Sequence, residues 1–401
     1  MKCIVIIGGQ LYNKGAESMT FTVIDEIVTR HPNKKIVLFS NSDYKRNEAD
    51  KNQYKFNIAF CNERIKFEIL GGVLKLINRI YKYSKYKTNY IKNEQKAIEI
   101  FKNAEMIIDI SGFALSSQRG FKRSLNYMLY IMIGKKFRVP TYIMPQSFGP
   151  FDYNEPIKTF LIKKLMKKYL SYPKVIFARE KEGYEIIKKY TKDNLQLSTD
   201  VVLQRKEELD IKNIYNSFIL ENNVFIKDNS VALIPNSKIM NYVNEDIIYR
   251  YYKEIIIFLV QKSKSVYLMR HSTEDIGICK RIKQQFSEEE NVILLEQDFN
   301  CFEINQILPH FSFIIASRYH AIIHAYRNGV PVIALGWAVK YKELLSLFDQ
   351  QNYLFDVRKM PDMIQFKASI DMMLNDRDKE SNIIKEKVKK VQDNNIFNVI
   401  F

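Results

Sequence analysis

The sequence predicts an α/β protein made of two domains, each built around a largely parallel sheet. In the first half of the chain, short apolar runs typical of buried strands alternate with longer helical patterns. The same alternation starts again after Asp200. The length of 401 residues also exceeds the size at which one hydrophobic core keeps growing, so two domains are expected. Two such domains that face each other leave a cleft at the carboxyl ends of their strands, where ligands of these sheets bind.

Ten strands are predicted, five in each domain. Those of the first domain are residues 3–7, 35–39, 106–110, 141–144 and 175–178, and those of the second are residues 230–234, 265–269, 292–295, 311–316 and 332–335. The polar stretch 204–229, which carries a helical pattern at 211–220, separates the two groups, so we place the boundary near residue 200. The predicted domains are residues 1–200 and 201–375, followed by a charged, lysine-rich helical tail at 376–401.

The chain is strongly basic, with 62 Lys and Arg against 45 Asp and Glu and a formal net charge of +17. This surplus favours phosphorylated ligands, an anionic membrane surface or nucleic acid without choosing among them. The four cysteines are far apart and fit neither a disulfide framework nor a zinc site, which favours a reducing compartment. The first apolar run is too short for a secretion signal, and no run reaches the roughly 18 apolar residues of a membrane span. We therefore expect a cytoplasmic protein with, at most, peripheral contact with the inner face of the membrane.

The segment 317–337 carries the clearest functional signal. Ser317 follows a buried strand and is predicted to cap a helix whose first turn holds Arg318 and His320 and whose end is marked by Gly329. Free N–H groups and the helix dipole favour an anion at this point, and the Arg318 guanidinium adds a fork that matches carboxylate or phosphate. The dipole also disfavours an imidazolium, so His320 is expected to be neutral near pH 7 and able to accept a proton. The segment therefore predicts a site for an anionic small molecule.

A second histidine, His324, lies four residues after His320, so both share one helical face. Such a pair can bind a metal ion, but no HExxH motif or nearby carboxylate completes a site. We predict no metal site and interpret His324 as a core residue or a support for His320.

Polar loops after the strands of the first domain are candidates for sugar contacts. The glycine-rich turn after the first strand matches neither GxGxxG nor a P-loop, so nucleotide binding by those routes is unsupported. Each of these loops is also explained by a tight turn or a solvent-facing segment. The candidates are Asn13, Gly15 and Glu17 in the glycine-rich turn, Ser111 and Gln118 in the serine-rich loop after residue 110, and Gln146 in the PQSFGPF turn, which could aim it into the cleft.

Charged and polar residues also follow three other predicted strands. Arg179 and Glu180 come directly after residues 175–178, where they either form an ion pair or bind an anion and move a proton. In the second domain, Asn236, His271 and Asp275 are candidates for acceptor contacts. His271 is equally well interpreted as a histidine of a surface loop.

Taken together, these segments resemble the polysaccharide pyruvyl transferase family, whose members attach a pyruvate ketal to sugars of bacterial surface polymers. The motif at 317–345 is specific by itself, and the order and spacing of the others support it. The resemblance rests on YNKGAESM at 12–19, IDISGFALSSQRG at 108–120, MPQSFGPF at 144–151, FARE at 177–180, LIPNSKI at 233–239 and SRYHAIIHAYRNGVPVIALGWAVKYKELL at 317–345.

The resemblance implies two Rossmann-like domains in a GT-B-like arrangement, with the acceptor on the side of the first domain and the donor on the side of the second. The implied donor is phosphoenolpyruvate, used as a co-substrate without a cofactor, and the implied acceptor is a sugar that is often lipid-linked. Arg318 and His320 fall on the Arg and His of the family's donor site. Where relatives commonly carry a Ser-His pair after the Trp, this chain has Ala338 and Val339, which puts the acceptor's identity in doubt.

Phosphoenolpyruvate agrees with the residues themselves, since its carboxylate and phosphate require at least two cationic sites. We expect Arg318, Ser317 and His320 to bind the donor from one side, with Arg179 or Lys340 opposite. The expected catalytic residues are His320 as base or acid, Arg318, and Glu180 as the second choice for proton transfer. The expected acceptor contacts are Asn13, Gly15, Glu17, Ser111, Gln118, Gln146, Asn236 and His271.

The basic segment 75–96, in which lysines alternate with tyrosines, could lie against anionic lipid and present a lipid-linked acceptor, or could be a solvated helix face. Two other functions fit the same features. One is a nucleotide-sugar glycosyltransferase of the same architecture, in which Arg318 would hold a diphosphate. The other is a non-catalytic basic protein that binds glycan or nucleic acid, although no nucleic-acid motif is present, and we expect no nucleic-acid partner.

Overall fold

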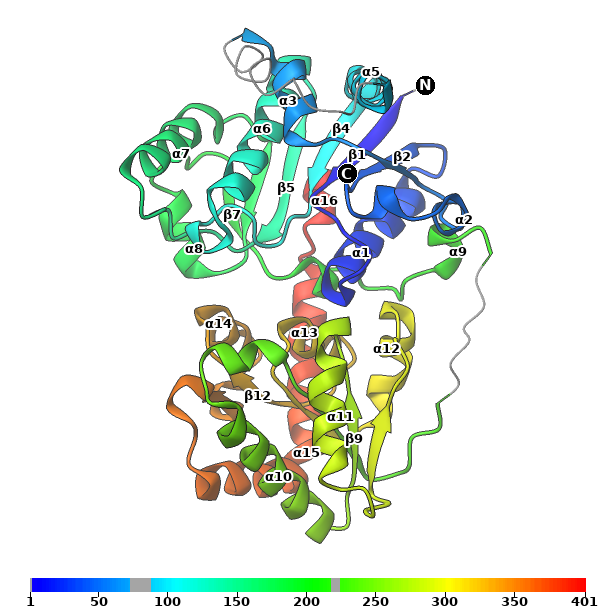
Figure 1. Cartoon of the computed structure of the whole chain (residues 1–401), viewed down its shortest axis with the longest axis vertical. Helices are drawn as coiled ribbons and strands as arrows, with labels where there is room; N and C mark the ends of the chain where they lie inside the picture. The colour runs from blue at the N-terminus through cyan, green and yellow to red at the C-terminus, as the bar shows by residue number, and fades with distance from the viewer. Residues whose placement is uncertain (1, 73–87, 218–223) are drawn as a thin grey trace.

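The computed structural model describes residues 2–72, 88–217 and 224–401, which form two α/β domains placed one above the other (Figure 1). The first domain holds a seven-stranded sheet in the order β3-β2-β1-β4-β5-β6-β7, and the second holds a six-stranded sheet in the order β10-β9-β8-β11-β12-β13. Neighbouring strands run parallel in both sheets. All five residues of β1 are buried, as expected for a strand covered by helices on both faces of its sheet.

The first domain is built from short strands and the helices that connect them. Its strands are β1 (Cys3–Ile7), β2 (Lys35–Phe39), β3 (Asn57–Ala59), β4 (Ala104–Asp109), β5 (Thr141–Gln146), β6 (Val175–Ala178) and β7 (Leu195–Leu197). Its helices are α1 (Lys14–Arg30), α2 (Glu48–Asn52), α3 (Glu63–Leu70), α5 (Thr88–Asn103), α6 (Phe121–Phe137), α7 (Pro156–Tyr169) and α8 (Lys181–Ile187).

The second domain repeats this plan after a linker that carries the short helix α9 (Ile211–Ile214). Its strands are β8 (Ser230–Ile234), β9 (Ser265–Met269), β10 (Val292–Leu295), β11 (Phe313–Ala316), β12 (Val332–Gly336) and β13 (Leu354–Asp356). Its helices are α10 (Glu245–Gln261), α11 (Ile276–Gln284), α12 (Cys301–Ile307), α13 (Tyr319–Arg327) and α14 (Val339–Leu347), and the chain ends in α15 (Met363–Asp393) and α16 (Phe397–Ile400).

All ten predicted strands are present, with end shifts of up to two residues. The sequence did not predict β3, β7 and β13, each of which has three residues and lies at an edge of its sheet. Such short edge strands carry too few residues for an alternating or continuous apolar pattern to be visible.

The C-terminal tail departs from the prediction of a separate helix from residue 376. The helix α15 begins already at Met363, runs along the second domain and ends at Asp393 near the level where the two domains meet (Figure 1). The short helix α16 then packs on the first domain, where Arg30 Nη2 donates to Asn398 Oδ1 at 2.9 Å and the rings of His31 and Phe401 lie 5.5 Å apart. The chain therefore crosses between the domains twice.

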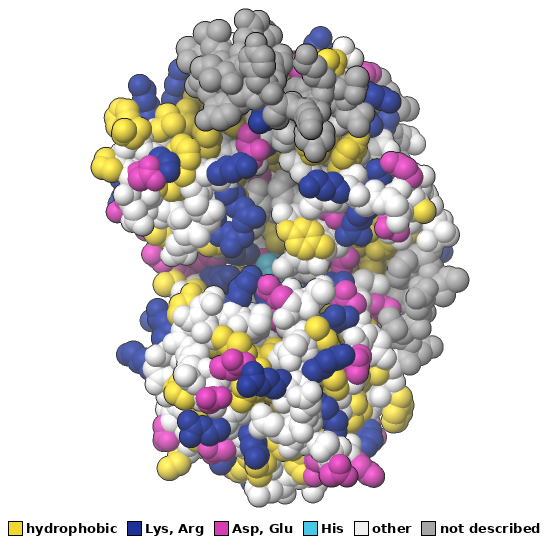
Figure 2. Space-filling view, viewed as in Figure 1, with side chains coloured by type: hydrophobic (Ala, Val, Ile, Leu, Met, Phe, Trp, Pro, Cys, Tyr) yellow, Lys and Arg dark blue, Asp and Glu magenta, His cyan; other side chains and the backbone are white. Residues whose placement is uncertain are grey.

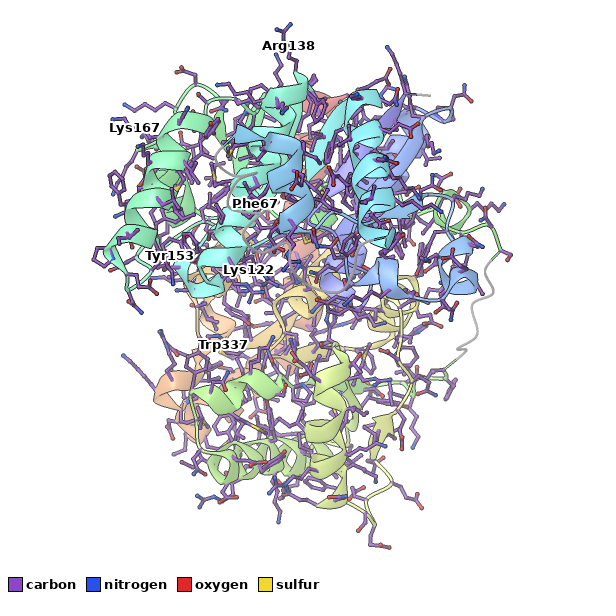
Figure 3. The ribbon with its side chains drawn as sticks, turned by 45° about the horizontal axis from the view of Figure 1, so that its top comes forward. Phe67, Lys122, Arg138, Tyr153, Lys167 and Trp337 are labelled. Carbon is purple, nitrogen blue, oxygen red and sulfur yellow. The ribbon has the colours of Figure 1, made fainter. Side chains whose placement is uncertain are left out.

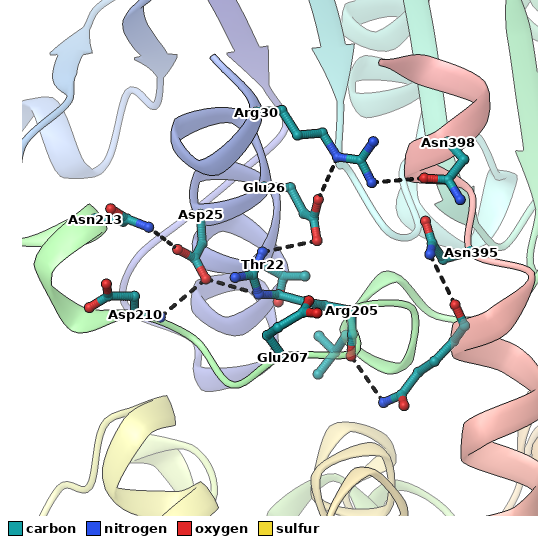
Figure 4. Close-up of polar contacts among 12 residues, drawn as sticks. Thr22, Asp25, Glu26, Arg30, Arg205, Glu207, Asp210, Asn213, Asn395 and Asn398 are labelled. Atoms are coloured by element: carbon teal, nitrogen blue, oxygen red, sulfur yellow. Dashed lines mark hydrogen bonds and ion pairs between the residues drawn. The ribbon is translucent and has the colours of Figure 1, made fainter. Parts of the chain in front are cut away.

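The linker is held against α1 by a buried ion-pair cluster (Figure 4). Arg205, 5% exposed, pairs with Asp25 at 3.0 Å and with Glu26 at 2.9 Å. Asp25 also accepts a hydrogen bond from Asn213 Nδ2 at 2.6 Å. From the second domain, Arg327 Nη1 donates to the backbone carbonyl of Arg205 at 2.6 Å. Residues 205–213 of the linker are thus fixed to the first domain, and Arg205 is also bound by the second.

The two domains also share an apolar contact between α1 and α12. The ring of Phe21 lies 5.9 Å from that of Phe302 and 5.7 Å from that of Tyr215. Beside these rings, Glu17 Oε2 accepts a hydrogen bond from the backbone N–H of Cys301 at 3.1 Å. This contact closes one side of the interdomain space.

The segment 75–96, which the sequence offered as a lipid contact, lies outside the described residues up to residue 87, and its remainder belongs to α5. Among the helices that the structure describes, none combines the length and apolar character needed to cross a bilayer.

Candidate functional site

A cleft of about 900 Å³ lies between the carboxyl ends of the two sheets. In Figure 2, a histidine and several lysine and arginine side chains are visible in the hollow between the two halves of the molecule. The first domain contributes residues that follow β1, β4, β5 and β6, and the second contributes residues that follow β8, β9, β11 and β12. Among the residues of the predicted site, those that line this cleft are Asn13, Gln118, Glu180, Asn236, His271, Arg318, His320 and Lys340.

Arg318 stands at the N-terminus of α13 and is held by two carboxylates of its own domain. Its Nε and Nη2 donate to Asp275 at 2.7 and 2.5 Å, and Nη2 also donates to Glu274 at 2.6 Å. Asp275 is fully buried and accepts further hydrogen bonds from the backbone N–H and the hydroxyl of Ser237. Asp275 therefore fixes the guanidinium, and Nη1 makes no hydrogen bond with any described residue.

The structure corrects the predicted role of Ser317 as the helix cap. The N-cap residue of α13 is Arg318, which makes no capping side-chain bond because a guanidinium has no acceptor for the backbone N–H groups of the first turn. Ser317 is 1% exposed, and its hydroxyl lies 3.3 Å from that of Tyr252. Its carbonyl accepts hydrogen bonds from Asn236 and Tyr341. Ser317 thus ties the end of β11 to neighbouring loops and does not reach the cleft.

His320 lies in the first turn of α13 and packs on the start of α1. A side chain at Gly15 would overlap its ring, so this glycine lets the two helix starts approach each other. Its Nε2 is buried, makes no hydrogen bond and lies 3.7 Å from Asp200 Oδ2. Nδ1 lies on the side of the ring that packs against Gly15, where an added Cβ would come within 2.3 Å of it.

The ring of His320 is neutral at ordinary pH. Burial lowers its pKa well below 6.5, and the neighbouring charges of Arg179 and Lys340 lower it further. The predicted protonation state is confirmed, although burial and nearby cations are the main causes rather than the helix dipole alone.

Arg179 and Glu180 form the ion pair that the sequence left open. Arg179 Nε donates to Glu180 Oε1 at 3.0 Å, and Nη1 donates to Asp200 at 2.8 Å. Ser147 bridges the pair, since it accepts from Arg179 Nη2 at 2.6 Å and donates to Glu180 at 2.8 Å. The guanidinium also lies 4.8 Å from the centre of the Tyr319 ring. All three guanidinium nitrogens are therefore engaged, which makes Arg179 a support of the site's wall.

Two other cations of the cleft have no carboxylate partner among the described residues. Lys340, in the first turn of α14, lies with its Nζ 4.8 Å from the centre of the Tyr319 ring. Burial and Arg179 lower its pKa to about 8, and Arg119 contributes across the cleft. Arg119 belongs to the serine-rich loop after β4. From this loop, the sequence suggested only hydroxyl and amide groups as ligands of a sugar. Burial, followed by Arg123, lowers the pKa of Arg119 as well. An anion between these groups would relieve their repulsion.

Four residues predicted to contact the acceptor do not line the cleft: Gly15, which packs against the ring of His320, and Glu17, Ser111 and Gln146. Gln146 is fully buried, and its Nε2 donates to the Met144 carbonyl at 3.4 Å. The prediction that its turn aims Gln146 into the cleft is wrong because β5 continues to this residue, and side chains alternate along a strand. The next residue, Ser147, lines the cleft instead. Glu17 faces α12, and Ser111 packs at the turn after β4, where its N–H donates to Asp109.

The remaining polar candidates have defined partners. Asn13 caps α1, with its Oδ1 accepting from the backbone N–H of Gly15 at 3.1 Å. His271 is 3% exposed, so its interpretation as a surface-loop histidine is wrong. Its ring centre lies 5.5 Å from that of His324, whose Nδ1 lies 2.9 Å from Asn305 Oδ1. His324 is thus a core residue beneath His320, one of the two interpretations that the sequence allowed.

Solved structures similar to this chain share its two-domain architecture. UDP-GlcNAc 2-epimerase from Neisseria meningitidis bound to UDP-GlcNAc superposes with a TM-score of 0.59 at 13% identity, covering 100% of this chain and 98% of that chain. UDP-GlcNAc 2-epimerase from Methanocaldococcus jannaschii gives 0.56 at 11% identity, covering 94% and 93%. Medicago truncatula UGT71G1 complexed with UDP-glucose gives 0.53 at 11% identity, covering 98% and 93%. At these identities the likeness establishes the GT-B fold alone.

Among proteins of curated function, none matches the sequence. The sequence profile of one family, polysaccharide pyruvyl transferase, matches residues 13–338. The match begins at the residue that caps α1 and ends two residues before Lys340, so it includes residues of both walls of the cleft. With this match over most of its length, the chain belongs to the polysaccharide pyruvyl transferase family.

Proposed function

We propose that this enzyme transfers the pyruvyl group of phosphoenolpyruvate to a sugar of a surface polysaccharide or of its lipid-linked precursor, forming a pyruvate ketal. The observation that carries the proposal is the pair of unmatched cations, Arg119 and Lys340, on opposite walls of a cleft that also holds the neutral His320. A small donor with two anionic groups fits such a site better than a neutral sugar does.

The donor's two acidic groups find separate partners in this arrangement. Lys340 and the free Nη1 of Arg318 lie on the side of the second domain, and Arg119 lies on the side of the first. Arg179 shapes this region through Tyr319, against which Lys340 also packs. We assign the phosphate to the side of α13, whose N-terminal dipole stabilises charge that develops as phosphate leaves.

Ketal formation joins two hydroxyl oxygens of one sugar to the central carbon of phosphoenolpyruvate. Two C–O bonds form there, the bond from that carbon to the phosphate oxygen breaks, and the methylene carbon gains a proton to become a methyl group. The two sugar hydroxyls lose their protons. One proton is equivalent to the one that the methylene carbon gains, and the other leaves with the phosphate. The reaction therefore requires a group that moves protons, and it balances without an oxidant or reductant.

His320 is suited to move those protons. His320 lines the cleft with a neutral ring, and its Nε2 faces Asp200 at 3.7 Å. A carboxylate in that position favours the tautomer that carries hydrogen on Nε2, which leaves the Nδ1 lone pair free to accept a hydroxyl proton. Asp200 is fully buried and is also held by Arg179, so it acts as a positioning residue. Glu180 lines the cleft and is the alternative proton acceptor.

The test is incubation of the purified chain with phosphoenolpyruvate and a panel of aryl and lipid-linked glycosides. We expect release of one phosphate per ketal formed, followed by mass spectrometry of the product. The variant His320→Gln should reduce kcat by a factor of about 10² or more, and Asp200→Asn should reduce kcat and shift its pH profile. Turnover with nucleotide sugars and none with phosphoenolpyruvate would instead make the enzyme a nucleotide-sugar glycosyltransferase.

A further inference from the structure

The helix α7 in the first domain exposes an apolar and basic face that the pyruvyl transfer itself does not use. It buries Ile162 and Met166 against the domain. Its opposite face exposes Ile157, Phe160 and Leu161, at 82%, 64% and 38% respectively. Side chains this apolar and this exposed, gathered within two helical turns, mark an interaction surface.

The same helix is rich in lysine and carries no acidic residue. Four of its lysines are exposed and form no ion pair with any described residue: Lys163, Lys164, Lys167 and Lys168. Figure 3 shows Lys167 projecting away from the body of the domain. An apolar stripe followed by unpaired lysines on one helix is complementary to a bilayer with anionic headgroups.

The apolar end of α7 lies close to the cleft. The helix connects β5 to β6, so it runs back from the cleft end of the sheet and begins near the cleft. Pro150, which lines the cleft, precedes Ile157 by seven positions, and a chain of that length spans at most about 25 Å. The apolar residues therefore lie at the end of α7 that is nearer to the cleft.

We propose that α7 docks the enzyme on an anionic phospholipid surface, with Ile157, Phe160 and Leu161 entering the interface and the lysines contacting headgroups. The inference rests on the proposed function in one respect, because docking would place the cleft beside a lipid-linked acceptor. It differs from the lipid contact expected of residues 75–96, since it depends only on described side chains.

Flotation with vesicles tests the docking without any reaction. We expect the full chain to bind phosphatidylcholine vesicles that contain phosphatidylglycerol, to bind pure phosphatidylcholine weakly, and to be released by high salt. The variant Ile157→Ser/Phe160→Ser should bind about tenfold more weakly. Its matched control is Ile364→Ser/Phe225→Ser, which changes the same residue types at side chains outside α7 that are 79% and 85% exposed. This control should bind vesicles as the wild type does.

A second pair of variants tests the basic part of the face. We expect Lys163→Gln/Lys167→Gln to weaken binding at low salt, and Lys389→Gln/Lys390→Gln, exposed lysines of α15, to leave it unchanged. Absence of vesicle binding by the wild type, or equal loss in the α7 and control variants, overturns the proposal. A wild-type dimer that Ile157→Ser/Phe160→Ser dissociates, without vesicle binding, would assign the face to a second copy.

Activity separates this inference from the proposed function. Turnover of a soluble aryl glycoside should be the same in all these variants, because none of the changed residues lines the cleft. Turnover of an acceptor in vesicles should fall in the α7 variants alone. Vesicle binding by an enzyme that does not use phosphoenolpyruvate would overturn the proposed function and leave the docking surface in place.

Discussion

The cations of the cleft divide into two kinds at the scale of single residues. Arg179 and Arg318 are each held by two carboxylates, so their charge is largely matched before any ligand binds. Lys340 and Arg119 face the same space without such partners. The paired arginines give the walls their shape, and the unpaired cations supply attraction for an anion. Substitutions of the two kinds should therefore have different consequences.

The first prediction concerns the pH dependence of donor binding. The pKa of Lys340 is lowered to about 8, so its side chain is charged below that pH and neutral above it. Affinity for phosphoenolpyruvate should be steady below pH 8 and should weaken as the pH rises through 8 to 9. In Lys340→Arg this decline should disappear, because a guanidinium stays charged.

The control is Lys342→Arg, which changes an exposed lysine of the same helix and should retain the wild-type profile. Calorimetric titrations across this range that show no inflection in the wild type would contradict the assignment.

The second prediction concerns Arg318, whose substitution by alanine we now expect to affect stability as well as activity. Removing the guanidinium leaves Asp275 buried without its cationic partner, at a cost of about 3 kcal/mol. Urea unfolding should therefore show a less stable Arg318→Ala. The double variant Arg318→Ala/Asp275→Asn should recover part of the loss but no activity. If both variants are as stable as the wild type, the ion pair of Arg318 with Asp275 contributes nothing to the free energy of unfolding.

At the scale of secondary structure, the sequence located the strands that line the cleft but not the direction of every side chain after them. Apolar runs identify β1, β4, β5, β6, β8, β9 and β11, so most polar residues that follow them could be assigned to the cleft in advance. Whether a residue enters the cleft depends on where its strand ends, as Gln146 and Ser147 show. Pairings between distant residues, such as Arg318 with Asp275, and interdomain contacts, such as Glu17 with Cys301, leave no local signal.

The third prediction concerns the contact of α1 with α12. Burial raises the pKa of Glu17 to about 7, from an ordinary value of 4.5. Because the folded state then binds a proton more tightly than the unfolded state, Glu17 contributes stability at low pH that is lost as pH rises from about 4.5 to 7. The loss is at most roughly 3 kcal/mol.

The variant Glu17→Gln mimics the protonated form and keeps an oxygen that can accept from Cys301. Relative to the wild type, its melting temperature should be similar at pH 5 and higher at pH 8. Glu48→Gln, at an exposed carboxylate of α2, should show no such difference. A Glu17→Gln variant that is destabilised equally at both pH values would show that Glu17 is ionised throughout.

At the scale of the whole molecule, the two domains are connected at several separate places. The linker is held by Arg205 and Arg327, α1 packs on α12, and the C-terminal segment returns to the first domain. These contacts set the distance between the cleft residues of the first domain, such as Arg119, and those of the second, such as His320 and Lys340. His320 and Asp200 approach within 3.7 Å only because both domains are held in this relation.

The last prediction tests whether the end of the chain is part of the first domain. Phe397 is fully buried in α16, so Phe397→Ala should cost about 3 kcal/mol of stability. Val399→Ala, at a side chain that is 54% exposed on the same helix, should cost little. Hydrogen exchange followed by mass spectrometry should show faster exchange in α1, against whose end α16 packs, while α10 of the second domain keeps its protection. Faster exchange confined to α10 would instead assign the C-terminal segment to the second domain.

Since α1 carries Gly15 against His320, we expect Phe397→Ala to lower kcat as well, although it changes no residue of the cleft.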